Sequence, residues 1–100
     1  MTIEKIRMKK ALDLRVEPWE PEDPLEKQGY IVGFSDPDIN QSMNGDTIER
    51  AMSGFLEYVF QLLRDYLEKP DEFAPRLAAQ CEKILEYFRW TWNPKTRSKR

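Results

Sequence analysis

Residues 29–67 read GYIVGFSDPDINQSMNGDTIERAMSGFLEYVFQLLRDYL, and this stretch decides the fold. It begins with a short apolar segment, passes through two polar turns and continues into a long amphipathic segment. The residues 30–34 carry apolar side chains on both faces of an extended chain, which predicts a strand with neighbours on either side. The strand is formed by Tyr30, Ile31, Val32, Gly33 and Phe34.

The second half of the stretch predicts a helix over 47–69. Apolar residues recur there every three or four positions, which places one face against a sheet. Asp46 and Thr47 are both candidates for the helix cap, and Asp46 has Glu49 three residues on, as a capping box requires. Gly54 costs about 1 kcal/mol relative to Ala inside a helix, so we expect close packing against the strands at that position. The stripe comprises Ile48, Met52, Phe55, Val59, Leu62, Leu63 and Tyr66.

Shorter patterns flank this helix and strand. Alternating apolar and charged residues predict a first strand over 9–17, and an acidic, proline-rich loop follows to residue 26. Residues 39–43 predict a short, weak third strand. Asn44 and Gly45 form a residue pair that tolerates positive φ, as a turn requires.

A second amphipathic stripe predicts a helix over 74–90. Its start is open between Asp71 and the Ala74-Pro75 pair, since proline is tolerated in a first helical turn. Together the elements predict one α+β domain over 1–92: a small three-stranded antiparallel sheet with two amphipathic helices packed on one face, in the order β-β-β-α-α. Residues 93–100 are expected to form a flexible basic tail. The second stripe comprises Leu77, Cys81, Ile84, Leu85 and Phe88.

Composition narrows the function classes. The chain of 100 residues has 34% charged residues and a net charge of −2, which disfavours a general nucleic-acid binder. One cysteine and no histidine cannot supply a disulfide or the usual zinc ligands, so no metal and no cofactor are expected. No apolar run is long enough for a membrane span and no signal peptide is recognisable, so we expect a cytoplasmic protein.

The carboxylates are the only candidates for catalysis. Asp36, Asp38 and Asp46 are the acids near the ends of the predicted sheet, and a hydrolase using them is one hypothesis. Acids beside Pro, Asn and Gly more often end strands and cap helices. The buried face of the second helix likewise predicts a structural thiol at Cys81. No catalytic residue is therefore expected, and the chain is predicted not to be an enzyme.

Two groups of residues are candidates for binding. The partner-binding candidates are the aromatic and acidic residues Trp19, Glu20, Glu22, Asp23, Tyr87, Trp90 and Trp92, because Trp and Tyr are enriched at protein interfaces. An isolated tryptophan such as Trp19 also folds commonly over a sheet edge. The nucleic-acid-binding alternative uses the basic ends of the chain. Its residues are Lys5, Arg7, Lys9 and Lys10 at the amino end and Lys95, Arg97, Lys99 and Arg100 at the carboxyl end.

The strand and the helix start resemble a known family. The resemblance rests on Tyr30, Val32, Phe34 and Asp36 in the strand and on Gly45, Asp46, Thr47, Glu49 and Ala51 at the helix start. These residues are similar to those of HicB-type antitoxins, over roughly residues 9–69, and the resemblance implies that the helix cap is Thr47. The resemblance implies a three-stranded antiparallel sheet covered by a helix and the binding of a small RNA-cleaving toxin. The carboxyl third contains no recognisable DNA-binding segment, although full-length members of the family have one.

The sequence thus predicts a non-enzymatic, HicB-like protein-interaction module. A small sheet leaves edge strands that pairing between subunits would cover, so a homodimer is expected. The other expected partner is a small basic, toxin-like protein that meets the acidic loop 17–26. A nucleic-acid-binding accessory protein and an uncharacterised hydrolase are the alternatives.

Overall fold

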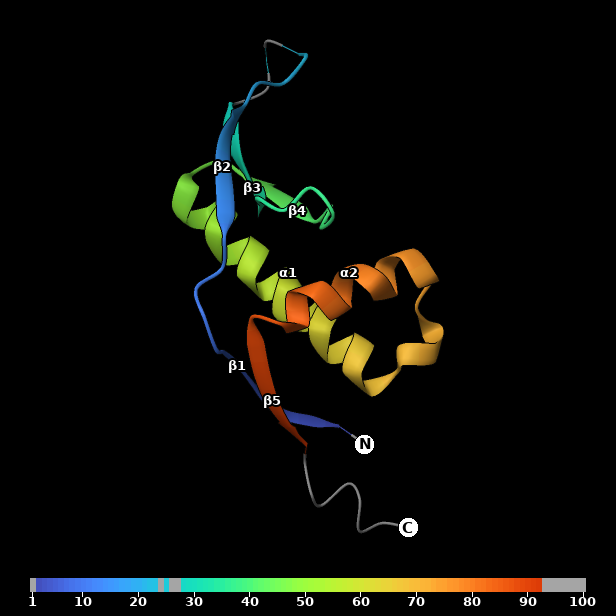
Figure 1. Cartoon of the computed structure of the whole chain (residues 1–100). Helices are drawn as coiled ribbons and strands as arrows, with labels where there is room; N and C mark the ends of the chain where they lie inside the picture. The colour runs from blue at the N-terminus through green and yellow to red at the C-terminus, as the bar shows by residue number, and fades with distance from the viewer. Residues whose placement is uncertain (1, 24, 26–27, 93–100) are drawn as a thin grey trace. The chain divides into compact units, whose positions relative to one another are not determined.

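The structure, a computed structural model, describes residues 2–23, 25 and 28–92. Over these residues the protein is α+β, as predicted, with strands in two antiparallel sheets and two α-helices (Figure 1). None of the helices in the described part of the chain is both long and apolar enough to cross a membrane. The elements in chain order are β1 (Ile3–Met8), β2 (Leu14–Trp19), β3 (Gly29–Phe34), β4 (Ser42–Gly45), α1 (Ile48–Glu68), a 3-10 turn (Pro70–Glu72), α2 (Pro75–Leu85) and β5 (Phe88–Trp92).

The chain divides into two compact units, which we describe separately. The sheet unit is the continuous segment 12–59 and contains β2, β3, β4 and the first half of α1. The ribbon unit combines residues 1–11 with residues 60–100 and contains β1, the second half of α1, α2 and β5. The single domain expected over 1–92 stays a prediction.

In the sheet unit, β3 lies between β2 and β4, so the prediction of a central strand is confirmed. Val32 and Phe34 point to one face and are buried, and the Phe34 ring packs edge-on against Phe55 of α1 with ring centroids 5.3 Å apart. The other face carries an exposed ion pair between Arg15 and Glu17. The sheet is therefore covered by the helix on one side, as expected for a small antiparallel sheet.

The helix start resolves the capping alternatives. The backbone N–H of Arg50 donates to Thr47 Oγ1 over 3.1 Å, so Thr47 caps α1. Asp46 instead forms an exposed ion pair with Arg50 over 3.1 Å. The predicted stripe is wrong at Ile48, which is 45% exposed, and it omitted Ala51, which is fully buried.

Gly45 has a different role from the one predicted. No described residue, glycine or other, has a positive φ, so the expectation based on turn conformation is wrong. Gly45 ends β4, and a Cβ there would lie 2.7 Å from the backbone nitrogen of Ala51. The glycine is required because the strand and the helix backbone approach each other closely.

In the ribbon unit, β1 and β5 pair antiparallel and lie side by side (Figure 1). The inner face contributes Ile3 and Phe88 to the core, and Phe88 packs edge-on against Phe60 at 5.4 Å. The second half of α1 forms hydrogen bonds with the first residue of β1. The Ile3 N–H donates to Glu68 Oε2 over 2.7 Å, and Arg64 donates to the Ile3 carbonyl oxygen over 3.2 Å.

Three predicted boundaries are wrong. The predicted strand 9–17 is replaced by two strands, β1 and β2, with residues 9–13 between them in no strand. The third strand lies at 42–45 rather than 39–43. The second helix ends at Leu85, and residues 88–92 form β5, so the β-β-β-α-α order gains a strand at each end. α2 begins at Pro75, with Ala74 as its N-cap residue, which decides between the two starts left open.

Candidate functional site

The sheet unit has a hollow that is both acidic and aromatic, which we call the acidic hollow. It measures about 250 Å³ and is lined by Pro18, Trp19, Glu20, Gln28, Gly29, Tyr30 and Asp46. The register places these residues together, since Trp19 lies opposite Gly29 and Pro18 lies opposite Tyr30. The hollow therefore sits where β2 leaves the sheet and β3 enters it.

Glycine shapes the floor of the acidic hollow. A Cβ on Gly29 would lie 2.5 Å from the carbonyl oxygen of Gly45, so β3 and β4 approach more closely there than any side chain would allow. Trp19 has no side chain opposite it on β3, because its partner is Gly29. The tryptophan is partly exposed and lines the hollow.

The charges of the acidic hollow differ in their partners. Asp46 is neutralised in part by Arg50, whereas Glu20 is exposed and has no ion pair with any described residue. A carboxylate beside an aromatic ring is suited to a cation, since a guanidinium or ammonium group can stack on the ring and pair with the acid. The hollow is chemically fitted to a lysine or arginine side chain of a partner.

The remaining predicted partner-binding residues are not part of this hollow. Glu22 and Asp23 are exposed in the loop after β2, and Asp23 Oδ1 accepts the Leu25 N–H over 2.9 Å. That contact gives Asp23 a role in the turn. The pair Glu22 and Asp23 adds negative charge to the loop that leads away from the hollow.

The predicted aromatic residues near the carboxyl end all belong to the ribbon unit. Tyr87 lies under the Lys10 ammonium group, which is 4.7 Å from the ring centroid. Trp90 and Trp92 are partly exposed residues of β5, opposite Ile6 and Ile3 of β1. The sequence grouped these three with Trp19 as one set, and the structure divides the set between the two units.

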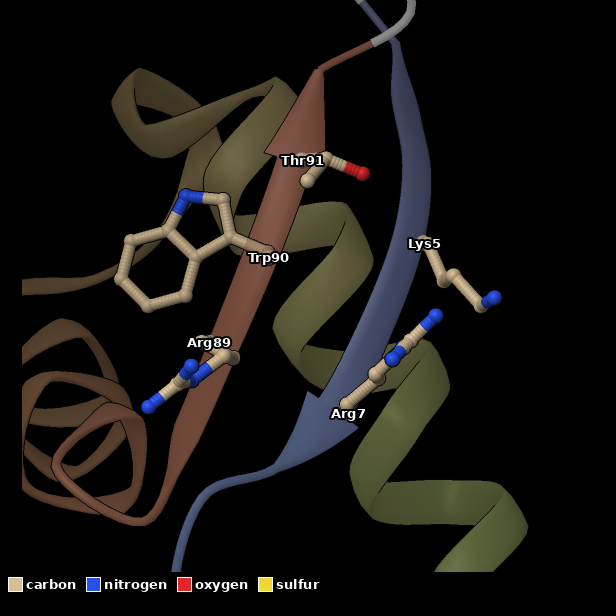
Figure 2. A pocket seen from close by; sticks show the side chains of 5 residues that line it. All are labelled: Lys5, Arg7, Arg89, Trp90 and Thr91. Atoms are coloured by element: carbon tan, nitrogen blue, oxygen red, sulfur yellow. The ribbon is translucent and has the colours of Figure 1, made fainter.

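A second hollow, the basic hollow, opens on the ribbon unit. It measures about 300 Å³ and is lined by Lys5, Arg7, Arg89, Trp90 and Thr91 (Figure 2). Lys5 and Arg7 come from β1 and the others from β5. Arg89 and Thr91 were not among the sequence-based candidates, because their place opposite Arg7 and Lys5 depends on the pairing of strands more than 80 residues apart.

A third hollow is lined mainly by acidic residues, and these residues form contacts within the protein. Asp65, Glu68, Lys69, Glu72 and Phe73 line it. Glu68 holds the end of β1, Lys69 pairs with Glu72 over 3.9 Å, and Asp65 accepts a hydrogen bond from Gln61. These contacts give the acids structural roles.

The carboxylates considered for catalysis have structural contacts as well. Asp36 Oδ1 accepts the Asp38 N–H over 2.9 Å, and the Asp36 carbonyl accepts the Ile39 N–H over 3.0 Å, which together form the turn after β3. Asp46 pairs with Arg50 at the start of α1. No group of three or more His, Cys, Asp or Glu side chains within the described residues could hold a metal ion.

Two ionisable groups of the ribbon unit are strongly perturbed. Burial, helped by the charge of Glu82, raises the pKa of the Cys81 thiol from 9.0 to about 11. A hydrogen bond to Glu82, with an O–O distance of 2.6 Å, raises the pKa of Tyr66 to about 12. Both shifts keep the groups protonated at neutral pH, so Cys81 is a poor nucleophile. Its predicted burial is confirmed.

The predicted tail 93–100, with Lys95, Arg97, Lys99 and Arg100, lies outside the described residues. Comparison of the chain with family models, with curated proteins and with solved structures gives no match in any of the three. The relation to HicB-type antitoxins therefore stays a resemblance of residues, and the function is argued below from the two hollows.

Proposed function

We propose that the protein is a non-enzymatic interaction module that receives a basic segment of another protein at the acidic hollow. The observation that carries the proposal is the combination in one hollow of Trp19 and Tyr30 with Glu20, whose carboxylate has no ion pair with a described residue. A cationic side chain entering it would stack on an aromatic ring and pair with the carboxylate. The fit is to one side chain at a time, which is typical of the anchor residues of an interface.

The surroundings of the hollow favour the same class of partner. The segment after β2 carries the exposed acids Glu20, Glu22 and Asp23 next to the hollow. Negative potential over such a loop attracts a positively charged protein and accelerates their encounter. A small basic protein, as the resemblance to HicB-type antitoxins implies, is the partner we propose.

The arrangement of the sheet unit supports the resemblance without deciding it. The unit has three antiparallel strands covered by a helix whose cap is Thr47, the position that the resemblance predicts. The HicB-like fold, the toxin-like partner and the cytoplasmic location are parts of this proposal.

A site-specific photocrosslink tests the proposal in the native host. We replace Gln28, an exposed residue that lines the acidic hollow, with benzoylphenylalanine in the full chain and identify covalent adducts by mass spectrometry. The matched control carries the same group at Glu57, which is exposed on α1 in the same unit. We expect a small basic protein to be captured from position 28 and not from position 57.

Binding of the captured protein is then measured by calorimetry. Glu20→Lys should weaken binding about tenfold or more, because it places a cation where the partner's cation binds. Glu57→Lys, with the same change in net charge, should leave the affinity unchanged. Capture of nothing but a second copy of this chain, or equal affinities for the two variants, would contradict the proposal.

A further inference from the structure

The outer face of the β1–β5 ribbon gathers positive charge without neutralising it. Lys5, Arg7 and Arg89 are exposed, and none of them forms an ion pair or a side-chain hydrogen bond with a described residue. β5 contains no acid. Glu4, the acid of β1, lies in the irregular step between Ile3 and Lys5 and has no ion pair either.

The strand register places like charges opposite each other. Arg7 is the direct cross-strand partner of Arg89, an arrangement that is destabilising in an antiparallel pair. In Figure 2 the two guanidinium groups turn apart, Arg7 toward Lys5 and Arg89 to the far side of β5, where Trp90 also lies. The ends of Lys5 and Arg7 are then two neighbouring cations without an ion-pair partner among the described residues.

The basic hollow also offers an aromatic surface. Trp90 lines the same hollow as the three cations and is partly exposed. The hollow, of about 300 Å³, is lined by Trp90 and by cations from both strands. Trp90 lies opposite Ile6 and alternates along β5 with Arg89 and Thr91, so its ring lies on the other side of the ribbon, beyond β5 in Figure 2. Aromatic rings beside lysine and arginine are the chemistry by which proteins bind single-stranded nucleic acids, with bases stacked on the rings and phosphates on the cations.

We propose that the β1–β5 ribbon binds single-stranded nucleic acid, with the phosphates on its basic face and one nucleotide turned around the edge of β5. Lys5, Arg7 and Arg89 contact phosphates, and one base stacks on Trp90 in the basic hollow. A duplex is disfavoured because its bases are stacked on one another and expose no face to an indole ring. The site is separate from the acidic hollow and does not depend on the function proposed there.

The experiment measures fluorescence anisotropy of labelled oligothymidylate and oligouridylate with the full-length protein over a range of salt concentrations. Three phosphate contacts on a single strand predict a slope of about −2 for log K against log salt. Arg7→Gln combined with Arg89→Gln removes two contacts and should reduce the slope to about −0.7. Arg76→Gln, an exposed arginine of α2 without an ion pair, is the matched control and should leave the slope unchanged.

A second variant separates stacking from charge. Trp90→Leu should weaken binding about tenfold while leaving the salt slope unchanged, because it removes the base contact and no phosphate contact. Trp90→Phe keeps an aromatic ring and should bind nearly as tightly as the wild-type protein. It tests stacking even where the Leu variant is unstable. Circular dichroism checks that each variant is folded.

The role of the tail is tested in the same full-length chain. Replacing Lys95, Arg97, Lys99 and Arg100 together with Gln should leave the effect of the Arg7 and Arg89 substitutions in place. Loss of all binding in this tail variant, together with wild-type binding in the Arg7 and Arg89 variant, would overturn the ribbon site. Absence of binding at low salt, equal affinity for a duplex, or equally effective competition by polyglutamate would also overturn it.

Discussion

Gly45 has no side chain, which allows the end of β4 to approach the start of α1 closely. A Cβ at this position would lie 2.7 Å from the nitrogen and 2.9 Å from the Cα of Ala51, distances that real Cβ atoms do not reach. We expect Gly45→Ala to destabilise the fold by about 1–3 kcal/mol, since the strand end and the helix start must move apart. Urea denaturation followed by tryptophan fluorescence measures the change, and a loss below the error of the method would contradict the close approach.

Gly54, inside α1, contrasts with Gly45 at the end of β4. The sequence predicted that close packing explains this glycine, but a Cβ there would meet only Met43 Cγ at an ordinary 3.6 Å. Gly54→Ala should therefore stabilise the protein by about 1 kcal/mol through helix propensity. The same urea titration tests it, and destabilisation would show that the space beside Met43 is smaller than described.

Cys81 should be chemically silent in the folded protein. With its pKa raised to about 11 by burial, about 0.1% of the thiol is ionised at pH 8, and the buried sulfur is also shielded from reagents. We expect negligible labelling by Ellman's reagent at pH 8 and stoichiometric labelling in denaturant. Rapid labelling of the native protein would contradict the burial.

The raised pKa of Cys81 also sets the sign of a pH effect. A proton held more tightly in the folded state stabilises the fold fully below the ordinary thiol value of 9.0, and this contribution is lost as the pH rises through about 11. The free energy of unfolding should therefore fall between these pH values. Cys81→Ser, which does not titrate there, should fall less steeply even if it is less stable overall.

At the scale of the elements, the cap of α1 gives a direct test. Thr47 Oγ1 accepts the Arg50 N–H, while Asp46 only pairs with the exposed Arg50 side chain. We expect Thr47→Ala to cost about 1 kcal/mol and Asp46→Ala to cost less, since exposed ion pairs contribute little. Thermal unfolding compares the two, and the reverse order would assign the cap to Asp46.

The bounds of α1 were predicted from the sequence more accurately than those of α2. The bounds of α1 were predicted to within one residue, because a cap, an acidic first turn and a long stripe all agree on a helix. The end of α2 was missed because Phe88 continues the helical stripe through Leu85. The alternation of Phe88, Trp90 and Trp92 with Arg89 and Thr91 was the signal for a strand, since aromatic and β-branched residues favour strands.

The pairing of β1 with β5 could not be predicted from local sequence patterns. The predicted strand over 9–17 includes part of β2 and no residue of β1. Only pairing with residues 88–92 separates β1 from β2, and such long-range pairing leaves no local trace in one sequence. The same gap explains why Arg89 was missing from the predicted binding residues although Lys5 and Arg7 were noted.

For the whole molecule, the exposed apolar residues bear on the oligomeric state. In the sheet unit, Val16 on the edge strand β2 is 41% exposed and Ile48 is 45% exposed. We expect a homodimer that covers this surface, seen as twice the monomer mass in sedimentation equilibrium. Val16→Lys should shift the protein toward the monomer, while Ser53→Lys on the exposed side of α1 should not. A monomer for the wild-type chain at all concentrations would contradict the expectation.

The sequence predicted only some of the residues that line the acidic hollow. Trp19 and Glu20 were found because a tryptophan within an acidic, proline-rich loop is conspicuous in the sequence, and the structure brings them into one hollow. Glu22 and Asp23 lie in the same acidic run but outside the hollow. Gly29, which leaves the position opposite Trp19 open, was not recognisable, because its role depends on strand register.

The pairing of β1 with β5 has a consequence for the order in which the protein forms during translation. The sheet unit is a continuous segment, 12–59, so all its strands have been synthesised before the last third of the chain. The ribbon unit must wait, because Ile3–Met8 finds its partner only when residues 88–92 have been synthesised. Until then the first strand has no neighbour, and its backbone N–H and C=O groups are those of an open edge.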